Sequence, residues 1–207
     1  MLSIALPKGR LGEKVYKLLQ TAGYFAEGLF EDGRKLIFEN PAIDARFFLV
    51  KPSDVGVYVE RGAADVGIVG KDILLEEKPD VYELLDLRIG RCDMAVAAKK
   101  DFLEDRGRPL RVATSFPNVA KDYFASVNRE IELIGLNGSV EIAPLLGMSD
   151  VIVDIVETGK TLRENGLDVK TVIMPISARL ICNKTSLKFK AAAVNGLSDA
   201  LATEVYR

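Results

Sequence analysis

The chain has 207 residues, of which 48% are hydrophobic and 28% charged, a composition typical of a globular protein with one large or two small domains. Its net charge of -2 argues against a protein that coats nucleic acid or binds an anionic membrane surface. The absence of histidine excludes sites built on a histidine base or a histidine metal ligand.

The sequence shows no clear targeting segment and no cysteine pattern typical of a disulfide or a metal site. The apolar run at residues 1–6 is too short for a signal peptide, and no run approaches the roughly 20 residues of a membrane span. Cys92 and Cys182 are far apart and follow no metal-ligand pattern, so we expect both to be reduced. These features predict a cytoplasmic protein.

The first part of the chain predicts the sequence strand, basic loop, helix three times. The predicted strands are Leu2–Leu6, Ala45–Val50 and Val66–Val69, and the loops after them carry Lys8 and Arg10, then Lys51, then Lys71 and Asp72. Such alternation predicts an open α/β sheet, in which ligands bind beyond the carboxyl ends of the strands. A single loop lysine is usually only solvated, but cations after three successive strands favour an anion site.

The second part repeats the alternation between two long extended segments. The two extended segments are 86–98 and 169–182. Between them we predict strands at 110–113, 131–134 and 150–155 and helices at 117–127 and 139–146. A closing helix is predicted at 187–205. Two α/β lobes joined by two crossing segments are typical of hinged solute-binding proteins, with the ligand in an interlobe cleft. We therefore predict an α/β, two-lobed, periplasmic-binding-protein-like (type II) fold with mixed sheets, in which lobe I is 1–88 plus 173–207 and lobe II is 89–172.

The stretch 151–167, VIVDIVETGKTLRENGL, predicts a phosphate site. An apolar strand leads into Glu157-Thr158-Gly159-Lys160-Thr161 and then into a short helix. Threonine hydroxyls, a glycine and the N–H groups of a helix start suit a phosphate. Position 154 is Asp where a nucleoside-triphosphatase loop has glycine, which excludes that loop. The alternative is an ordinary strand-to-helix turn with a threonine cap.

Three motifs together resemble the ATP phosphoribosyltransferase family. Asp154–Leu167 follows D-x-V-x-T-G-x-T-L-x-x-N-G-L, Leu6–Leu11 reads L-P-K-G-R-L, and Glu60–Asp72 follows E-x-G-x-x-D-x-G-I-x-G-x-D. The resemblance implies a glycosyltransferase of histidine biosynthesis that joins ATP to phosphoribosyl diphosphate (PRPP). Because the chain ends at Arg207, it looks like the short form. That form implies a homo-oligomer within a hetero-oligomer, with a regulatory subunit resembling histidyl-tRNA synthetase.

The same resemblance implies roles for individual residues. The 5′-phosphate of PRPP is expected to bind to the loop Glu157, Thr158, Gly159, Lys160 and Thr161, and the ribose hydroxyls to Glu141 and Asp154. The diphosphate or ATP is expected to bind to Lys8, Lys51, Lys71 and Asp72. The charge that develops in catalysis is expected to be stabilised by Arg10 and Arg34. Mg²⁺ is expected to be held mainly by substrate oxygens, since Ile155 stands where other phosphoribosyltransferase loops have a second acid. A simpler role for Glu141 is to complement the dipole at a helix start.

The reaction requires little proton transfer, which fits a chain without histidine. Nitrogen 1 of adenine already has a lone pair, so the barrier lies in breaking the bond to diphosphate, where guanidinium groups stabilise the departing charge. A phosphoribosyltransferase for another base and a non-catalytic solute-binding protein are the alternatives. The sequence does not identify the residues that contact adenine, the stoichiometry, or the route of histidine feedback.

Overall fold

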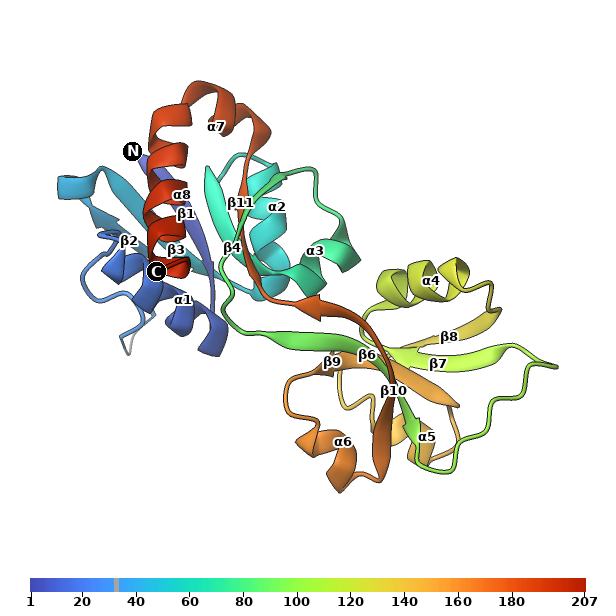
Figure 1. Cartoon of the computed structure of the whole chain (residues 1–207). Coiled ribbons are helices and arrows are strands. Elements are labelled where there is room, and N and C mark those ends of the chain that lie inside the picture. The colour runs from blue at the N-terminus through green and yellow to red at the C-terminus, as the bar shows by residue number, and fades with distance from the viewer. Residues whose placement is uncertain (32–33) are drawn as a thin grey trace. The chain divides into compact units, whose positions relative to one another are not determined.

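The computed structural model describes residues 1–31 and 34–207, which form two compact units (Figure 1). Unit 1 contains Met1–Gly90 and Ser177–Arg207, and unit 2 contains Arg91–Ile176. These breaks lie close to the predicted domain boundaries at 88/89 and 172/173. Among the described residues, every helix is too short or too polar to traverse a bilayer.

Unit 1 is built on a six-stranded mixed sheet. In spatial order its strands are β2 (Ile37–Asn40), β3 (Ala45–Val50), β1 (Leu2–Pro7), β4 (Val66–Gly70), β11 (Ala178–Cys182) and β5 (Tyr82–Asp86). β1 is parallel to β3 and to β4, whereas β2, β11 and β5 are antiparallel to their neighbours. The three predicted strands that precede basic loops are therefore the three parallel ones.

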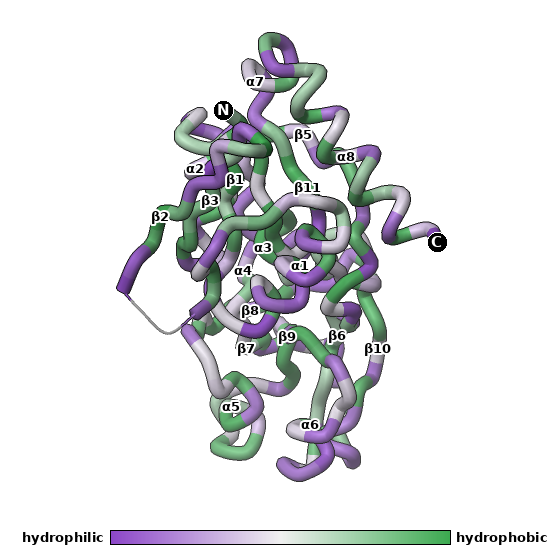
Figure 2. Tube along the Cα trace, turned by 90° about the vertical axis from the view of Figure 1, so that its left-hand side faces the viewer, coloured by the Kyte–Doolittle hydropathy of each residue, from purple (hydrophilic) through white to green (hydrophobic). Residues whose placement is uncertain are grey.

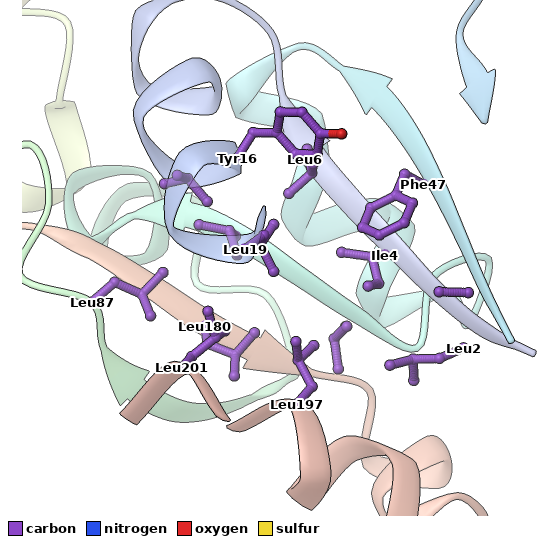
Figure 3. Close-up of a cluster of buried hydrophobic side chains, with 14 of the residues drawn as sticks. Leu2, Ile4, Leu6, Tyr16, Leu19, Phe47, Leu87, Leu180, Leu197 and Leu201 are labelled. Atoms are coloured by element: carbon purple, nitrogen blue, oxygen red, sulfur yellow. The ribbon is translucent and has the colours of Figure 1, made fainter. Parts of the chain in front are cut away.

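Helices cover both faces of this sheet, which explains why every residue of β1 is buried. The helices are α1 (Arg10–Thr21), α2 (Val55–Glu60), α3 (Lys71–Glu77), α7 (Lys184–Phe189) and α8 (Ala191–Val205), with 3₁₀ turns at Pro41–Ile43 and Pro52–Asp54. Leu2, Ile4 and Leu6 pack with leucines of α1 and α8 (Figure 3). Ala5 points the other way and packs with Val55 of α2, because successive side chains of a strand alternate between faces.

A buried carboxylate ties the two ends of unit 1 together. Asp65, 5% exposed, accepts hydrogen bonds from the backbone N–H of Ser3 (2.8 Å), the hydroxyl of Ser186 (2.6 Å) and the ammonium of Lys190 (2.7 Å). The Lys190 ammonium also donates to the carbonyl of Met1 (3.0 Å). These hydrogen bonds hold the pKa of Asp65 below its usual value although burial opposes the shift. We call this set the Asp65 cluster.

Unit 2 is a smaller mixed sheet. Its strands in spatial order are β10 (Leu167–Ile176), β6 (Cys92–Lys99), β9 (Val151–Val156), β7 (Leu110–Thr114) and β8 (Ile131–Gly135), and its helices are α4 (Pro117–Ser126), α5 (Ile142–Leu145) and α6 (Lys160–Glu164). β7 is parallel to β8 and β9, and β6 is antiparallel to β9 and β10. Figure 1 shows α4 on one face and α5 with α6 on the other, and Figure 2 shows apolar residues concentrated in strands such as β9.

Three predicted elements were wrong in detail. The predicted helix 187–205 is divided into α7 and α8 because Lys190, with φ -124° and ψ 29°, turns inward to the Asp65 cluster. The predicted helix 139–146 is shorter, Ile142–Leu145, and Ser139, with a left-handed φ of 48°, lies outside it. The predicted extended segment 86–98 is interrupted after β5 by Arg88 and Gly90, whose φ values are 56° and 64°.

Candidate functional site

The predicted phosphate loop and acids of unit 2 lie along one edge of its sheet. β7, β8 and β9 are parallel, and Thr114 is in register with both Gly135 and Val153. Because the carboxyl ends of these strands point to the same edge of the sheet, the loops 115–116, 136–141 and 157–159 lie along that edge. We call these three loops, with the end of β9, the unit 2 edge.

The phosphate loop is a left-handed turn followed by a short helix. Gly159, with φ 67° and ψ 9°, precedes the first residue of α6, and an L side chain rarely adopts this conformation. The Lys160 N–H donates to the Thr158 hydroxyl at 3.3 Å. In the described part of the chain, the N-cap residue Gly159 makes no side-chain hydrogen bond to α6, so the N–H groups that follow Lys160 at its start are available to an anion. Leu162 anchors the helix in the core, while Thr161 stays exposed.

The two predicted acids come together on the same face of the sheet as α6. Asp154 is two residues after Ile152 in β9, so both side chains lie on one face of the sheet, and Ile152 packs against Leu162 of α6. Glu141 is the residue immediately before α5. Burial first, and then the negative charge of Glu141, raises the pKa of the Asp154 carboxyl. The structure thus places Asp154 and α6 on one face of the sheet, where the negative charge of Glu141 acts on Asp154.

The predicted cations of unit 1 also follow strands that end at one edge. Pro7 is in register with Val50, and the Lys8 N–H donates to the Val50 carbonyl at 2.8 Å. Lys8 and Lys51 are exposed, as is Arg10 at the first position of α1. We call the loops after β1, β3 and β4 the unit 1 edge.

Gly12 fixes the geometry of the loop that carries Lys8 and Arg10. A Cβ atom at Gly12 would lie only 1.8 Å from the carbonyl oxygen of Pro7, so only glycine lets α1 approach the end of β1 this closely. Gly9, with φ 85°, supplies the turn between them. The L-P-K-G-R-L motif is thus a tight strand-to-helix connection that presents two cations.

Lys71 differs from the other cations because its charge is already balanced. Its ammonium lies 2.5 Å from a carboxylate oxygen of Glu83, whose other oxygen lies 3.3 Å from Nε of Arg179. Burial raises the pKa of Asp72, while the N–H of Ile73 stabilises its charged form. The sequence did not identify Glu83 and Arg179, because these partners come from β5 and β11.

Arg34 is exposed and precedes β2 in the chain. The two residues before it, 32–33, are outside the described part of the chain. Arg10, Arg34, Lys8, Lys51, Lys71 and Asp72 belong to unit 1, and Glu141, Asp154 and residues 157–161 belong to unit 2. Their assignment to particular parts of a substrate stays a prediction.

Two hydroxyls at the unit 2 edge were not predicted as part of the site. Thr114 donates to the carbonyl of Val153 at 2.7 Å, and Ser115 donates to the carbonyl of Leu136 at 2.7 Å. The only signal in the sequence was a Thr-Ser pair at a strand end, which is also common in ordinary turns.

Comparison with known proteins identifies the family. Residues 51–203 match the family model HisG, ATP phosphoribosyltransferase. The ATP phosphoribosyltransferase of Brachyspira hyodysenteriae is 61% identical over 191 residues, which are 92% of this chain and 93% of that protein. The ATP phosphoribosyltransferase of Geobacillus kaustophilus is 48% identical over 205 residues, which are 99% of each.

The fold is shared with a solved structure, the ATP phosphoribosyl transferase (HisG:HisZ) complex from Thermotoga maritima. The similarity has a TM-score of 0.86 at 35% identity and covers 100% of this chain and 99% of that one. With the two mixed sheets, this confirms the predicted α/β, periplasmic-binding-protein-like (type II) fold class. From its sequence and its fold, the chain belongs to the ATP phosphoribosyltransferase family.

Proposed function

We propose that this chain transfers the phosphoribosyl group of PRPP to nitrogen 1 of the adenine of ATP and releases diphosphate, the first step of histidine biosynthesis. The observation that carries the proposal is the unit 2 edge, where a glycine turn, the start of α6 and two acidic side chains follow the ends of three parallel strands. Family membership supports the same activity. The chain is then a transferase, more specifically a glycosyltransferase.

In this proposal unit 2 binds the phosphoribosyl part of PRPP. The loop 157–161 holds the 5′-phosphate through backbone N–H groups and the hydroxyls of Thr158 and Thr161. Asp154 and Glu141 accept hydrogen bonds from the ribose hydroxyls, which keeps the sugar oriented while its anomeric carbon reacts. Carboxylates suit this role because they are strong acceptors and can bind two hydroxyl groups at once.

Unit 1 supplies the positive charge that two polyphosphate substrates need. Lys8 and Lys51 are exposed, so phosphate oxygens can reach them. We assign Lys8, Lys51, Lys71 and Asp72 to the diphosphate of PRPP or to ATP. Arg10 and Arg34 stabilise the charge on the departing diphosphate, since a guanidinium remains charged and binds phosphate through two parallel hydrogen bonds.

The residues present fit Mg²⁺ held chiefly by substrate. Among the described residues, no group of three or more histidine, cysteine or acidic side chains is placed to hold a metal ion. The acid pair Asp154 and Glu141 offers the oxygen ligands that Mg²⁺ prefers, and PRPP would supply the rest. When bound, Mg²⁺ neutralises charge on the diphosphate leaving group. The side chains of this chain orient the ribose and the phosphates around it.

We further propose that the chain acts in the cytoplasm with a regulatory partner. The solved structure it resembles is a HisG:HisZ complex, and a similar partner, resembling histidyl-tRNA synthetase, fits the short-form prediction. In this arrangement the chain is a homo-oligomer within a hetero-oligomer. Histidine should inhibit the complex with the partner but not this chain alone, and inhibition of the isolated chain would contradict the assignment.

A direct assay tests the activity. The chain, with a HisZ-type partner supplied, is incubated with PRPP, Mg²⁺ and either ATP or other bases, and diphosphate release and the phosphoribosylated product are measured. Turnover with ATP alone supports the proposal. Turnover only with another base would indicate a different phosphoribosyltransferase. Binding of PRPP without any turnover would indicate a non-catalytic binding protein.

A further inference from the structure

The end of β9 extends beyond its neighbour β7. The two strands stay in register only as far as Thr114 and Val153, while β9 continues beside β6 for Asp154, Ile155 and Val156. β7 leaves the sheet at this point, and the chain enters α4 at Pro117. Asp154 is therefore bordered by another strand on one side only, which is why it is half-buried rather than covered.

The hydroxyl of Thr114 replaces backbone hydrogen bonds at the point where β7 leaves the sheet. Thr114 has no exposed surface, and its hydroxyl donates to the carbonyl of Val153 at 2.7 Å while accepting the N–H of Phe116 at 2.8 Å. One side chain thus satisfies two backbone groups that a departing strand would leave unpaired. Val153 is the residue directly before Asp154, so this hydrogen bond fixes the backbone from which that carboxylate projects.

The next residue performs the same task for the second acid. The Ser115 hydroxyl donates to the carbonyl of Leu136 at 2.7 Å, and the Leu136 N–H donates to the carbonyl of Thr114 at 2.9 Å. Leu136 begins the loop that leads to Glu141. The hydroxyls of Thr114, at the end of β7, and of Ser115, directly after it, therefore secure the β9 segment on one side and the start of the β8–α5 loop on the other.

We propose that Thr114 and Ser115 are positioning residues that hold Asp154 and Glu141 at the separation that the ribose of PRPP requires. Neither hydroxyl needs to contact the substrate. A small displacement of either backbone segment would move the acid on that segment and weaken the ribose contact that it makes. This inference rests on the proposed function, since it takes PRPP as the ligand.

The decisive variant is Thr114→Val, which keeps the buried shape and removes the hydroxyl. The Val153 carbonyl and the Phe116 N–H then lose a buried partner, and the local backbone must shift to recover one. We expect KM for PRPP to rise by about 10- to 100-fold, with KM for ATP and kcat nearly unchanged. Thr114→Ser, which retains the hydroxyl, should restore KM. Ser115→Ala should raise KM for PRPP by less, because Ser115 is only half-buried and water can replace its hydroxyl.

A matched control separates positioning from general destabilisation. Ser186→Ala removes another buried hydroxyl, the one that donates to Asp65 in unit 1, so it should lower Tm and leave KM for PRPP unchanged. Equal increases in KM for Ser186→Ala and Thr114→Val would overturn the proposal, and so would a failure of Thr114→Ser to restore KM. If Thr114→Val does not fold, Ser115→Ala decides, and an unchanged KM for PRPP then overturns it.

Calorimetric titration of the unmodified chain with PRPP separates this proposal from the proposed function. A parent chain that does not bind PRPP overturns both. A parent that binds PRPP and turns over ATP, with a folded Thr114→Val variant of unchanged KM, overturns only the positioning role.

Discussion

The unit 1 edge and the unit 2 edge share a topology but differ in how their polar groups are held. Each is formed where three parallel strands end. At the unit 1 edge Lys8 and Lys51 are exposed on long side chains, whereas at the unit 2 edge Asp154 is half-buried on a strand secured by Thr114. The first arrangement suits polyphosphates, whose charge is spread over many oxygens. The second suits a sugar ring, whose hydroxyls have fixed directions.

The largest expected effect tests whether a cation of unit 1 outside its edge contributes to the chemical step. Arg34→Ala should lower the single-turnover rate by roughly 10²–10³, about 3–4 kcal/mol, by analogy with the loss of one transition-state donor. KM for PRPP should change much less. Single-turnover measurements are needed because slow product release in the parent would hide a slower chemical step.

The neighbouring lysine is the control for Arg34. Lys35→Ala removes one positive charge from the same segment, where its ammonium lies 5.0 Å from the centroid of the Phe38 ring, and should leave the rate near that of the parent. A single-turnover rate for Arg34→Ala within about threefold of the parent would refute the role, since one lost donor costs far more.

The next prediction concerns the unit 2 edge, where a substitution should change KM for PRPP rather than kcat. Thr161→Ala should raise KM for PRPP by the equivalent of about 1.5–3 kcal/mol, the cost of one hydrogen bond to a charged group. The 5′-phosphate is remote from the bond that breaks, so kcat should be kept. Thr203→Ala, which removes an exposed hydroxyl of α8, is the control. An unchanged KM for PRPP would remove Thr161 from the site.

A third prediction uses thermal stability to test whether Asp154, which is half-buried, serves PRPP binding at the expense of stability. Since the pKa of Asp154 is raised in the folded chain, its ionisation lowers stability as pH rises from the unfolded pKa through the folded one. Asp154→Asn should therefore raise Tm at neutral pH, by about 2–4 °C for each kcal/mol, and still weaken PRPP binding.

An acid just before the same strand should respond in the opposite way. Hydrogen bonds from Arg108 and then Arg111 hold the pKa of Asp150 far below its usual value, although burial opposes the shift. Its stabilising contribution is present above the unfolded pKa and is lost as pH falls, so Asp150→Asn should lower Tm at neutral pH. Thermal unfolding of both variants at neutral and acidic pH checks the pair, and equal shifts in one direction would refute this account.

The smallest effect is expected within the unit 1 edge. Lys71→Met should change KM for ATP and PRPP by less than the equivalent of about 1 kcal/mol, because Glu83 already balances that charge and Arg179 remains as its partner. Lys8→Met should cost more, since Lys8 is exposed and precedes Gly9 and Arg10 in the tight connection to α1. A larger effect for Lys71→Met than for Lys8→Met would contradict this ranking.

The elements at both edges could be predicted because each depends on local sequence. The apolar runs of β1, β3, β4 and β9, with the basic or glycine-containing loops after them, fix strand, turn and helix within a few residues of one another. The motif at 154–161 likewise specifies its own turn through Gly159. Local patterns of this kind identify the loops but not the side chains that secure them.

What the sequence did not show depends on partners far along the chain. The break at Lys190 exists because its ammonium reaches Asp65, 125 residues away. The neutralisation of Lys71 depends on Glu83 from β5, a strand that was not predicted. The role of Thr114 depends on Val153, 39 residues later. Hydropathy patterns carry no information about such pairs until the strand order is known.

The Asp65 cluster also sets the order in which the chain can fold during synthesis. Unit 2 is one continuous segment that is complete at Ile176, but unit 1 joins Met1–Gly90 to Ser177–Arg207. Asp65 remains without its Ser186 and Lys190 partners until the C-terminal segment emerges from the ribosome. Unit 2 can therefore fold before unit 1 does. We expect a nascent chain stopped before Ser186 to have a protease-resistant unit 2 and an unfolded unit 1.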